Sequence, residues 1–141
     1  MTGWDELTVG ASAEPRTDKP LTVTDFVRYQ GASGDMNPIH HDPAFAKKAG
    51  YDTVFAVGML GAGRLSTLVT DWLGPRNLRR FGVRFKEQAW PGDELTYTAV
   101  VTSRREEDGE RLVDLELTCT RQTGGTHLQG WATVAVPGAH A

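Results

Sequence analysis

The stretch from Ser33 to Asp42, "SGDMNPIHHD", holds the residues of this 141-residue chain whose types and spacing best suit chemistry. Asp35 and His40 lie five residues apart, with Asn37 and Pro38 between them. A carboxylate and an imidazole together can take and give a proton, which is the basis of general acid–base catalysis. Proline stiffens such a loop, because it restricts its own backbone and that of the preceding residue. A polar turn with a surface histidine also fits these facts, so both interpretations remain open at this point.

Two short helices are predicted around this loop. The stretch "TVTDFVRYQGAS" begins with threonines that can cap a helix, and it predicts a helix from Thr24 to about Ala32, ended by Gly31 and Gly34. The stretch "DPAFAKKAG" has an N-cap, a proline at the first helical position and a closing glycine, which predict a second helix. The residues between them are turn formers, so we expect a loop there.

The longest helical pattern runs from Gly58 to Leu73 and carries a broad apolar stripe. Gly61 and Gly63 lie inside it, and each costs about 1 kcal/mol of helix stability relative to alanine. We therefore expect a sheet or a ligand to approach the helix backbone closely at these glycines.

After Gly74 and Pro75 the pattern changes to period two. Four strands joined mainly by hairpins are predicted in "LRRFGVRFKEQ", "DELTYTAVVTSRR", "RLVDLELTCTRQ" and "HLQGWATVAV", separated by "WPGD", "EEDGE" and "TGGT". The N-terminal "LTVGASAE" is a candidate extra strand. Cys119 shares one strand face with Val113, Leu115 and Leu117, which predicts a core residue and not a nucleophile. A helix laid across a curved antiparallel sheet is the economical α+β arrangement, here as one domain over residues 1–141.

Composition narrows the classes of function. Hydrophobic residues make up 39% of the chain and charged residues 23%, which is typical of a globular protein with one core. The net charge of −3 argues against general nucleic-acid binding. No apolar run approaches the ~20 residues that cross a bilayer, and the N-terminus lacks the features of a secretory signal. A single cysteine cannot form an internal disulfide, so we expect a cytoplasmic protein.

The stretch from Tyr29 to Ala46, "YQGASGDMNPIHHDPAFA", resembles a known signature. It has an aromatic residue, then Ser-Gly-Asp-x-Asn-Pro-aliphatic-His, then an alanine six residues on. This is similar to the MaoC-like family of R-specific enoyl-thioester hydratases and (3R)-hydroxyacyl dehydratases, most of all the catalytic subunits of type II elongation dehydratases. The likeness continues through "FAVGML" and "FKEQAWPGDEL". It implies a hot-dog fold, in which a curved antiparallel sheet wraps one long central helix.

The resemblance also implies roles for individual residues. Asp35 and His40 match the catalytic pair, and Asn37 matches the asparagine that organises the loop. Gly58 matches the glycine whose backbone N–H faces the thioester oxygen, which is physically reasonable because helix N-termini carry unpaired N–H groups and partial positive charge. Ser66 matches a serine that lines the site in some relatives, although a plain serine on the helix surface fits equally well.

The activity implied is that of a hydro-lyase. It would be a (3R)-hydroxyacyl-thioester dehydratase or R-specific enoyl-thioester hydratase acting on acyl carrier protein or coenzyme A thioesters in fatty acid or polyketide metabolism. No metal or redox cofactor is expected, because the thioester itself acidifies the α-proton. Exposed sheet edges are normally covered, so we expect a homodimer or a heterodimer with a related hot-dog subunit.

Two alternative functions stay open. A hot-dog acyl thioesterase would place a carboxylate on or near the central helix and lack this motif, and a non-catalytic subunit of a heterodimeric dehydratase would not need both Asp35 and His40. One departure from the family is Val57, where many members have histidine. We expect Val57 to modify helix-start packing or substrate preference and to leave the catalytic pair in place.

Other polar residues carry weaker predictions. His40, His41 and Asp42 are adjacent and seldom converge on one ion, so no metal site is expected, and His41 is interpreted as solvated or packed at the next helix start. Gly92 and Asp93 are interpreted as a hairpin turn with no further role. A basic cluster either forms a solvated face or contacts the phosphates of coenzyme A or an acidic carrier protein, with Arg79, Arg80 and Arg84 as the candidates. The cluster consists of Arg76, Arg79, Arg80, Arg84 and Lys86.

Overall fold

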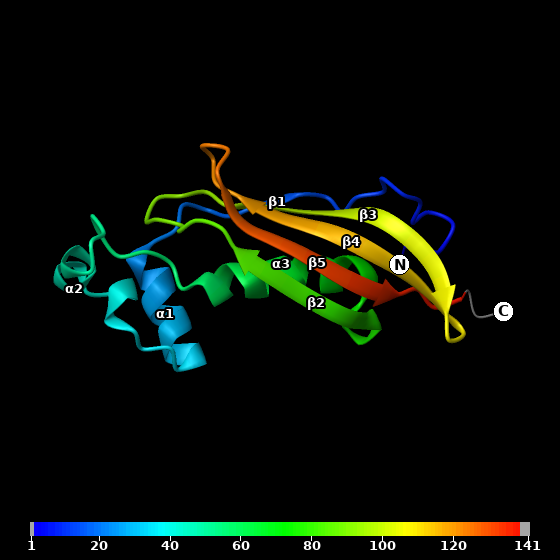
Figure 1. The fold of residues 1–141 in the computed structure, drawn as a ribbon, viewed down its shortest axis with the longest axis horizontal. Coiled ribbons are helices and arrows are strands. Elements are labelled where there is room, and N and C mark those ends of the chain that lie inside the picture. Colours follow the sequence, from blue (N-terminus) through cyan, green and yellow to red (C-terminus); the bar gives the residue numbers. More distant parts are fainter. Residues whose placement is uncertain (1, 139–141) are drawn as a thin grey trace.

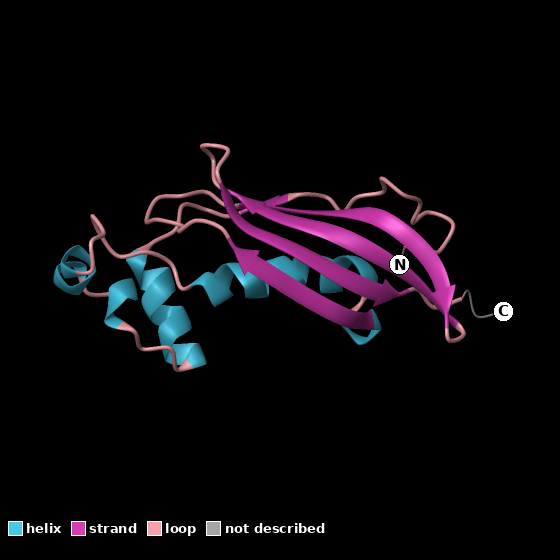
Figure 2. Ribbon diagram, viewed as in Figure 1, coloured by secondary structure: helices cyan, strands magenta, loops and turns pink. Residues whose placement is uncertain are grey.

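A computed structural model describes residues 2–138, which form a curved antiparallel sheet with a helix against one face (Figures 1 and 2). The sheet has five strands in the order β1-β3-β4-β5-β2. Their bounds are Arg16–Thr17 (β1), Leu78–Phe85 (β2), Thr96–Glu107 (β3), Glu110–Thr120 (β4) and Thr126–Ala135 (β5). The α+β architecture predicted for a hot-dog fold is confirmed.

The central helix α3 runs from Gly58 to Leu73, with the bounds that the sequence predicts, and it lies along the concave side of the sheet (Figure 1). Its buried side, which includes Leu65 and Leu68, packs on the inward side chains of the strands. Burying one such leucine contributes about 1.5–3 kcal/mol, so this contact is a substantial part of the core. Cys119 is fully buried in the same core, which confirms its predicted place, and burial raises the pKa of its thiol to about 12.

Two shorter helices lie beyond one end of the sheet (Figure 1). Helix α1, Val23–Ser33, begins with a capping box at Thr22 and ends at Gly34, whose φ of 79° suits glycine. Gly31 therefore lies inside the helix, and the prediction that it ends α1 is wrong. Helix α2, Pro43–Lys48, begins at its predicted N-cap, Asp42. Between them Pro38–His40 forms one turn of 3-10 helix.

Strand β5 approaches α3 at one of the two glycines in the helix interior, Gly61 and Gly63. A Cβ on Gly61 would lie 3.1 Å from Nε2 of His127 and 3.2 Å from Cδ1 of Leu128, so the sheet comes closest there. A Cβ on Gly63 would meet nothing within 4 Å. The predicted close approach is confirmed at Gly61 and wrong at Gly63, which faces outward because the two positions are 200° apart around the helix.

The strand connections differ from the prediction at one point. Hairpins join β3 to β4 and β4 to β5 as expected, but β2 pairs with β5 and not with β3. The "WPGD" segment is therefore not a hairpin turn: it belongs to a ten-residue loop, 86–95, that crosses the end of the sheet. Asp93 in this loop is only 4% exposed, so the prediction of a plain turn is wrong.

The predicted N-terminal strand is present in part. Gly10 and Ala13 donate backbone hydrogen bonds to the carbonyls of Val101 and Ala99, and Ser12 makes a single bridge to β3. The two-residue strand β1 follows, a little later than "LTVGASAE". The N-terminal segment thus covers the β3 edge of the sheet and leaves β2 as the other edge.

Candidate active site

A cleft of about 310 Å³ opens where α3 begins. Four segments line it: the predicted reaction loop, residues 55–59 around the start of α3, residues 85–88 at the end of β2, and the first part of β5. The structure brings three predicted site residues to this cleft, namely Asp35, His40 and Gly58. It adds His127, which the sequence did not single out.

The side chain of Gln30 shapes the loop that carries Asp35. It is 1% exposed, and its amide donates hydrogen bonds to the carbonyls of Asp35 (2.8 Å) and Asn37 (3.0 Å). Asn37 accepts from the N–H of Ile39 (3.1 Å) and so caps the 3-10 turn. Asn37 points back to its own backbone and does not line the cleft, as expected of a loop organiser. The Gln30 side chain also bonds Nδ1 of His41 at 2.9 Å, which places His41 beside α1 and outside the cleft.

His40 is held in one orientation. It is 8% exposed, its Nδ1 lies 2.7 Å from the carbonyl of Phe55, and the Phe55 ring packs edge-on against it at 5.2 Å. A carbonyl only accepts, so Nδ1 carries a proton and Nε2 is the ring nitrogen left to exchange protons with a substrate. Asp35 is exposed on the cleft wall, and its Oδ1 accepts a hydrogen bond from the N–H of Asn37 at 3.3 Å. A fixed imidazole and an accessible carboxylate can together move protons on a molecule bound between them.

The first turn of α3 supplies hydrogen-bond donors to the same cleft. Val57 is the N-cap residue and offers no side-chain cap, so the first N–H groups of the helix stay free of such a partner. These donors and the helix dipole favour negative charge there. A Cβ on Gly58 would lie 2.5 Å from the Phe85 ring, so glycine allows Phe85 to cover this turn. Val57 is buried at 3% exposure, which makes the position an apolar packing site.

His127 reaches the cleft because of a β-bulge. Cys119 pairs with Leu128 and Thr120 with Thr126, so His127 is the extra residue in β5 and both it and Leu128 are buried. Its Nδ1–H donates to the carbonyl of Glu87 at 2.6 Å, and its buried Nε2 has no hydrogen-bond partner within residues 2–138. Burial lowers the pKa of His127, so the ring is neutral near pH 7. Strict alternation in "HLQGWATV" places this histidine on the outer face, which is why sequence reasoning missed it.

Comparison with known proteins agrees with this geometry. The sequence profile of the family described as "MaoC like domain" matches residues 6–123. The chain belongs to the MaoC-like family. An (R)-specific enoyl-CoA hydratase of Rhodospirillum rubrum is 32% identical over 95% of this chain and 91% of its own length. A mitochondrial 3-hydroxyacyl-[acyl-carrier-protein] dehydratase of Solanum lycopersicum is 26% identical over 80% of this chain and 68% of its own. The solved (R)-hydratase of A. caviae, described as involved in PHA biosynthesis, superposes with a TM-score of 0.81 at 28% identity, covering 93% of this chain and 98% of its own.

Ser66 lies outside the cleft of this MaoC-like chain. Its hydroxyl donates to the carbonyl of Gly63 at 2.7 Å, one turn earlier in α3. The structure does not bring it to Asp35 and His40, and its place in an acyl-binding surface stays a prediction. Helix α3 carries one carboxylate, Asp71, near its far end, where it pairs with Arg16.

The candidate arginines also lie apart from the reaction cleft. Arg79 is held by Glu110 at 2.6 Å, and Arg80 and Arg84 lie beside Trp131 on the outer face of the sheet. Of the predicted basic cluster, Lys86 alone lines the cleft. A role for the arginines in binding a carrier therefore remains a prediction.

Within residues 2–138, no three histidine, cysteine or acidic side chains lie close enough together to hold a metal ion. Over that same part of the chain, none of the helices combines the length and apolar character needed to cross a bilayer.

Proposed function

We propose that this MaoC-like protein is a hydro-lyase that removes water from a (3R)-hydroxyacyl thioester or adds it to an enoyl thioester. The observation that carries the proposal is one cleft that joins an accessible carboxylate, an imidazole of fixed tautomer and an uncapped helix start. Relatives that share most of this chain's length are named as enzymes of this class, which supports the same conclusion.

In the proposed reaction the start of α3 and the Asp35–His40 pair have different roles. The thioester oxygen binds at the N–H of Gly58, where negative charge develops as the α-proton leaves. In dehydration, Asp35 or His40 takes the α-proton, and the electrons of that C–H bond form the double bond as the bond between Cβ and the hydroxyl oxygen breaks. The other residue enters this step protonated and gives its proton to the departing hydroxyl, which leaves as water. Hydration is the reverse. His40 acts through Nε2, because Nδ1–H is bound to the Phe55 carbonyl. The proposed reaction needs no metal or redox cofactor, since the thioester itself acidifies the α-proton.

The substrate class is an acyl thioester of coenzyme A or of acyl carrier protein, used in fatty acid or polyketide metabolism. Lys86 is the cation on the cleft wall, so it is the first candidate to meet a phosphate of either carrier. The cytoplasm remains the proposed compartment, because the single cysteine, Cys119, is free and cannot form an internal disulfide.

A second subunit belongs to the proposed functional unit. Strand β2 is an edge strand, and the side chains of Phe85 and Met59 beside the cleft are each 53% exposed. Sheet edges of this kind are normally paired, and exposed apolar patches often mark surfaces that a partner covers. We therefore propose a homodimer, or a heterodimer with a related hot-dog subunit, with the acyl chain held near the shared surface. Sedimentation of a fully active monomer would contradict this.

The test of function is hydration of a crotonyl thioester, followed as loss of conjugated absorbance, with release of free thiol measured in parallel. General acid–base groups contribute roughly 10²- to 10⁴-fold, so Asp35→Asn and His40→Ala should each lower kcat by about that factor. His41→Ala is the matched control, because His41 lies outside the cleft. Near-normal turnover in folded Asp35→Asn would refute the assignment, and thiol release without hydration would establish the thioesterase alternative.

A further inference from the structure

The loop between β2 and β3 touches the reaction cleft twice. Residues 86–88 form one wall of the cleft. Further along, the carbonyl of Ala89 accepts a hydrogen bond from the N–H of Ala56 at 2.9 Å, and the Trp90 ring lies 5.7 Å from the ring of Phe55. Phe55 holds His40 both through its carbonyl and through its ring. The loop therefore contacts the segment that holds His40 at two points, through the hydrogen bond to Ala56 and through the rings of Trp90 and Phe55.

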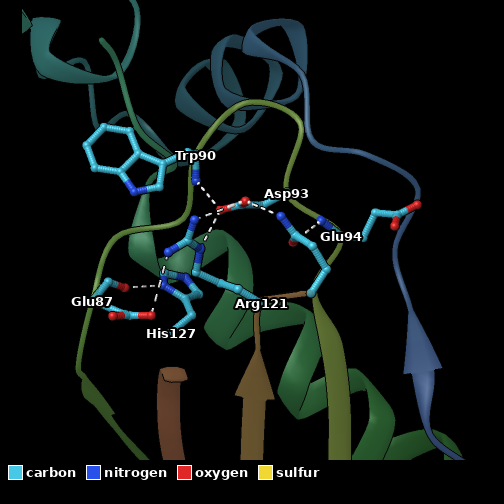
Figure 3. A network of polar contacts seen from close by, with 7 residues as sticks. Glu87, Trp90, Asp93, Glu94, Arg121 and His127 are labelled. Carbon is cyan, nitrogen blue, oxygen red and sulfur yellow. Dashed lines mark hydrogen bonds and ion pairs between the residues drawn. The ribbon is translucent and has the colours of Figure 1, made fainter. Parts of the chain in front are cut away.

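A buried carboxylate holds the loop in place (Figure 3). Asp93 accepts the N–H of Trp90 at 2.8 Å, two hydrogen bonds from Arg121 at 2.8 and 3.2 Å, and one from Gln122 at 2.8 Å. Burial raises the pKa of Asp93, but these hydrogen bonds outweigh it and leave the pKa below its ordinary value. Arg121 also approaches the carboxylate of Glu87 at 3.7 Å. A plain turn needs none of these contacts, whereas they fix the position of a loop that forms one wall of the cleft.

His127 holds the same loop at a second point. Its Nδ1–H is bonded to the backbone carbonyl of Glu87, one residue beyond Lys86, and Figure 3 shows the ring beside Glu87 and Arg121. Arg121 directly follows β4 and His127 lies at the start of β5, so both come from the same hairpin. The bulge that turns His127 inward is the feature that lets one hairpin hold the loop from two sides.

We propose that Asp93, Arg121 and His127 are positioning residues for the reaction: they hold loop 86–95 against the segment of Phe55 and so fix His40 in its reactive orientation. The proposal rests on the proposed hydro-lyase function and assigns that site a support outside its predicted motif. Loss of this network should lower the rate of proton transfer more than it weakens substrate binding, because Asp93 and Arg121 do not line the cleft.

The test compares Asp93→Asn and Arg121→Lys with Asp114→Asn. Asp93→Asn keeps the side-chain volume and removes the charge, and Arg121→Lys is the milder variant because it keeps the charge and loses the paired geometry. Asp114 is the matched control: this carboxylate also accepts from an arginine and from two hydroxyls, but on the outer face of the sheet. Misplacement of a catalytic group by about 1 Å can cost 10²-fold, so kcat should fall roughly 10- to 100-fold in the two network variants, with KM changed less than about threefold. Asp114→Asn should keep kcat.

A second measurement separates positioning from stability and from function. The ring ¹⁵N shifts of His40 should show the Nδ1–H tautomer in the parent and in Asp114→Asn, and a mixture of tautomers in Asp93→Asn and Arg121→Lys. His127→Asn, which keeps a donor for the Glu87 carbonyl, should retain the parent His40 shifts, whereas His127→Ala should not. Unchanged His40 shifts and unchanged kcat in folded Asp93→Asn and Arg121→Lys would overturn the proposal. A parent protein without hydratase turnover would overturn the proposed function alone, since the NMR measurement needs no turnover.

Discussion

Replacing Gly61 of α3 with alanine tests how closely strand β5 packs against the start of the central helix. The new methyl group would lie 3.1–3.3 Å from three atoms of His127 and Leu128, which is closer than ordinary van der Waals contact. The same replacement at Gly63, two residues later in the same helix, meets nothing within 4 Å. The two variants therefore share one change in helix propensity and differ in packing.

The expected difference follows from these distances. Alanine is favoured over glycine in a helix interior by about 1 kcal/mol, so Gly63→Ala should raise the free energy of unfolding by roughly that amount. Gly61→Ala gains the same term but overpacks the core, which typically costs 1–3 kcal/mol. The His127 ring has little freedom to withdraw, because its Nδ1–H is bonded to Glu87. Gly61→Ala should thus be roughly 1–3 kcal/mol less stable than Gly63→Ala.

Urea unfolding of both variants, with equal slopes required for the comparison, measures this difference. The assay is run near pH 8, well above the lowered pKa of His127. Gly61→Ala should also lower kcat/KM for a crotonyl thioester, because a displaced His127 moves the cleft wall, whereas Gly63→Ala should not. If both variants are stabilised equally, β5 does not contact α3 as described, and the explanation offered for Gly61 is wrong.

Three further predictions concern other groups. In the unfolded chain His127 takes up a proton near pH 6.5, whereas in the folded protein burial lowers its pKa, so the free energy of unfolding should fall below about pH 6.5, by up to about 1.4 kcal/mol per pH unit. Urea titrations at several pH values should show a weaker pH dependence of the unfolding free energy in His127→Asn. The same pH dependence in the parent and the variant would contradict this prediction. With a pKa of about 12, the Cys119 thiol should resist alkylation near pH 8 until the protein unfolds, so rapid labelling of the native protein would contradict its burial. Arg84→Gln should raise KM for a carrier-bound thioester and weaken the salt dependence of KM. Arg79→Gln should have a smaller effect, because Arg79 is already paired with Glu110. Equal KM values for the parent and both variants would show that these arginines only form a solvated face.

The features that the sequence predicts well are those that neighbouring residues determine. The proline and aspartate that start α2, and the loop between α1 and α2, follow from capping and turn chemistry within a few residues. The bounds of α3 follow from its apolar stripe and from Gly74 at its end. Asp35 and His40 lie on one short loop, so their meeting in one cleft required no knowledge of the sheet.

The features that the sequence missed depend on distant partners. The residues of β2 do not indicate whether it pairs with β5 or with β3, and hairpin rules favour β3, which is the wrong partner. The inward turn of His127 depends on a bulge defined by its pairing with β4. Asp93 looks like a turn residue until Arg121, 28 positions later, is placed beside it. In each case a contact between separated segments decides the structure, and local periodicity carries no information about such contacts.

The sheet order has a consequence for how the chain folds. Strands β3, β4 and β5 form a meander of neighbouring hairpins, whose local contacts form early and fast. Strand β2 precedes all three in the chain, yet its hydrogen-bonding partner is β5, so it must wait until residues 126–135 have been synthesised and paired. Until then the apolar residues of β2 lack their partner strand, and unpaired strands with exposed apolar residues are prone to aggregation. The end of β2 forms one wall of the cleft, so the cleft is complete only once β2 has paired with β5.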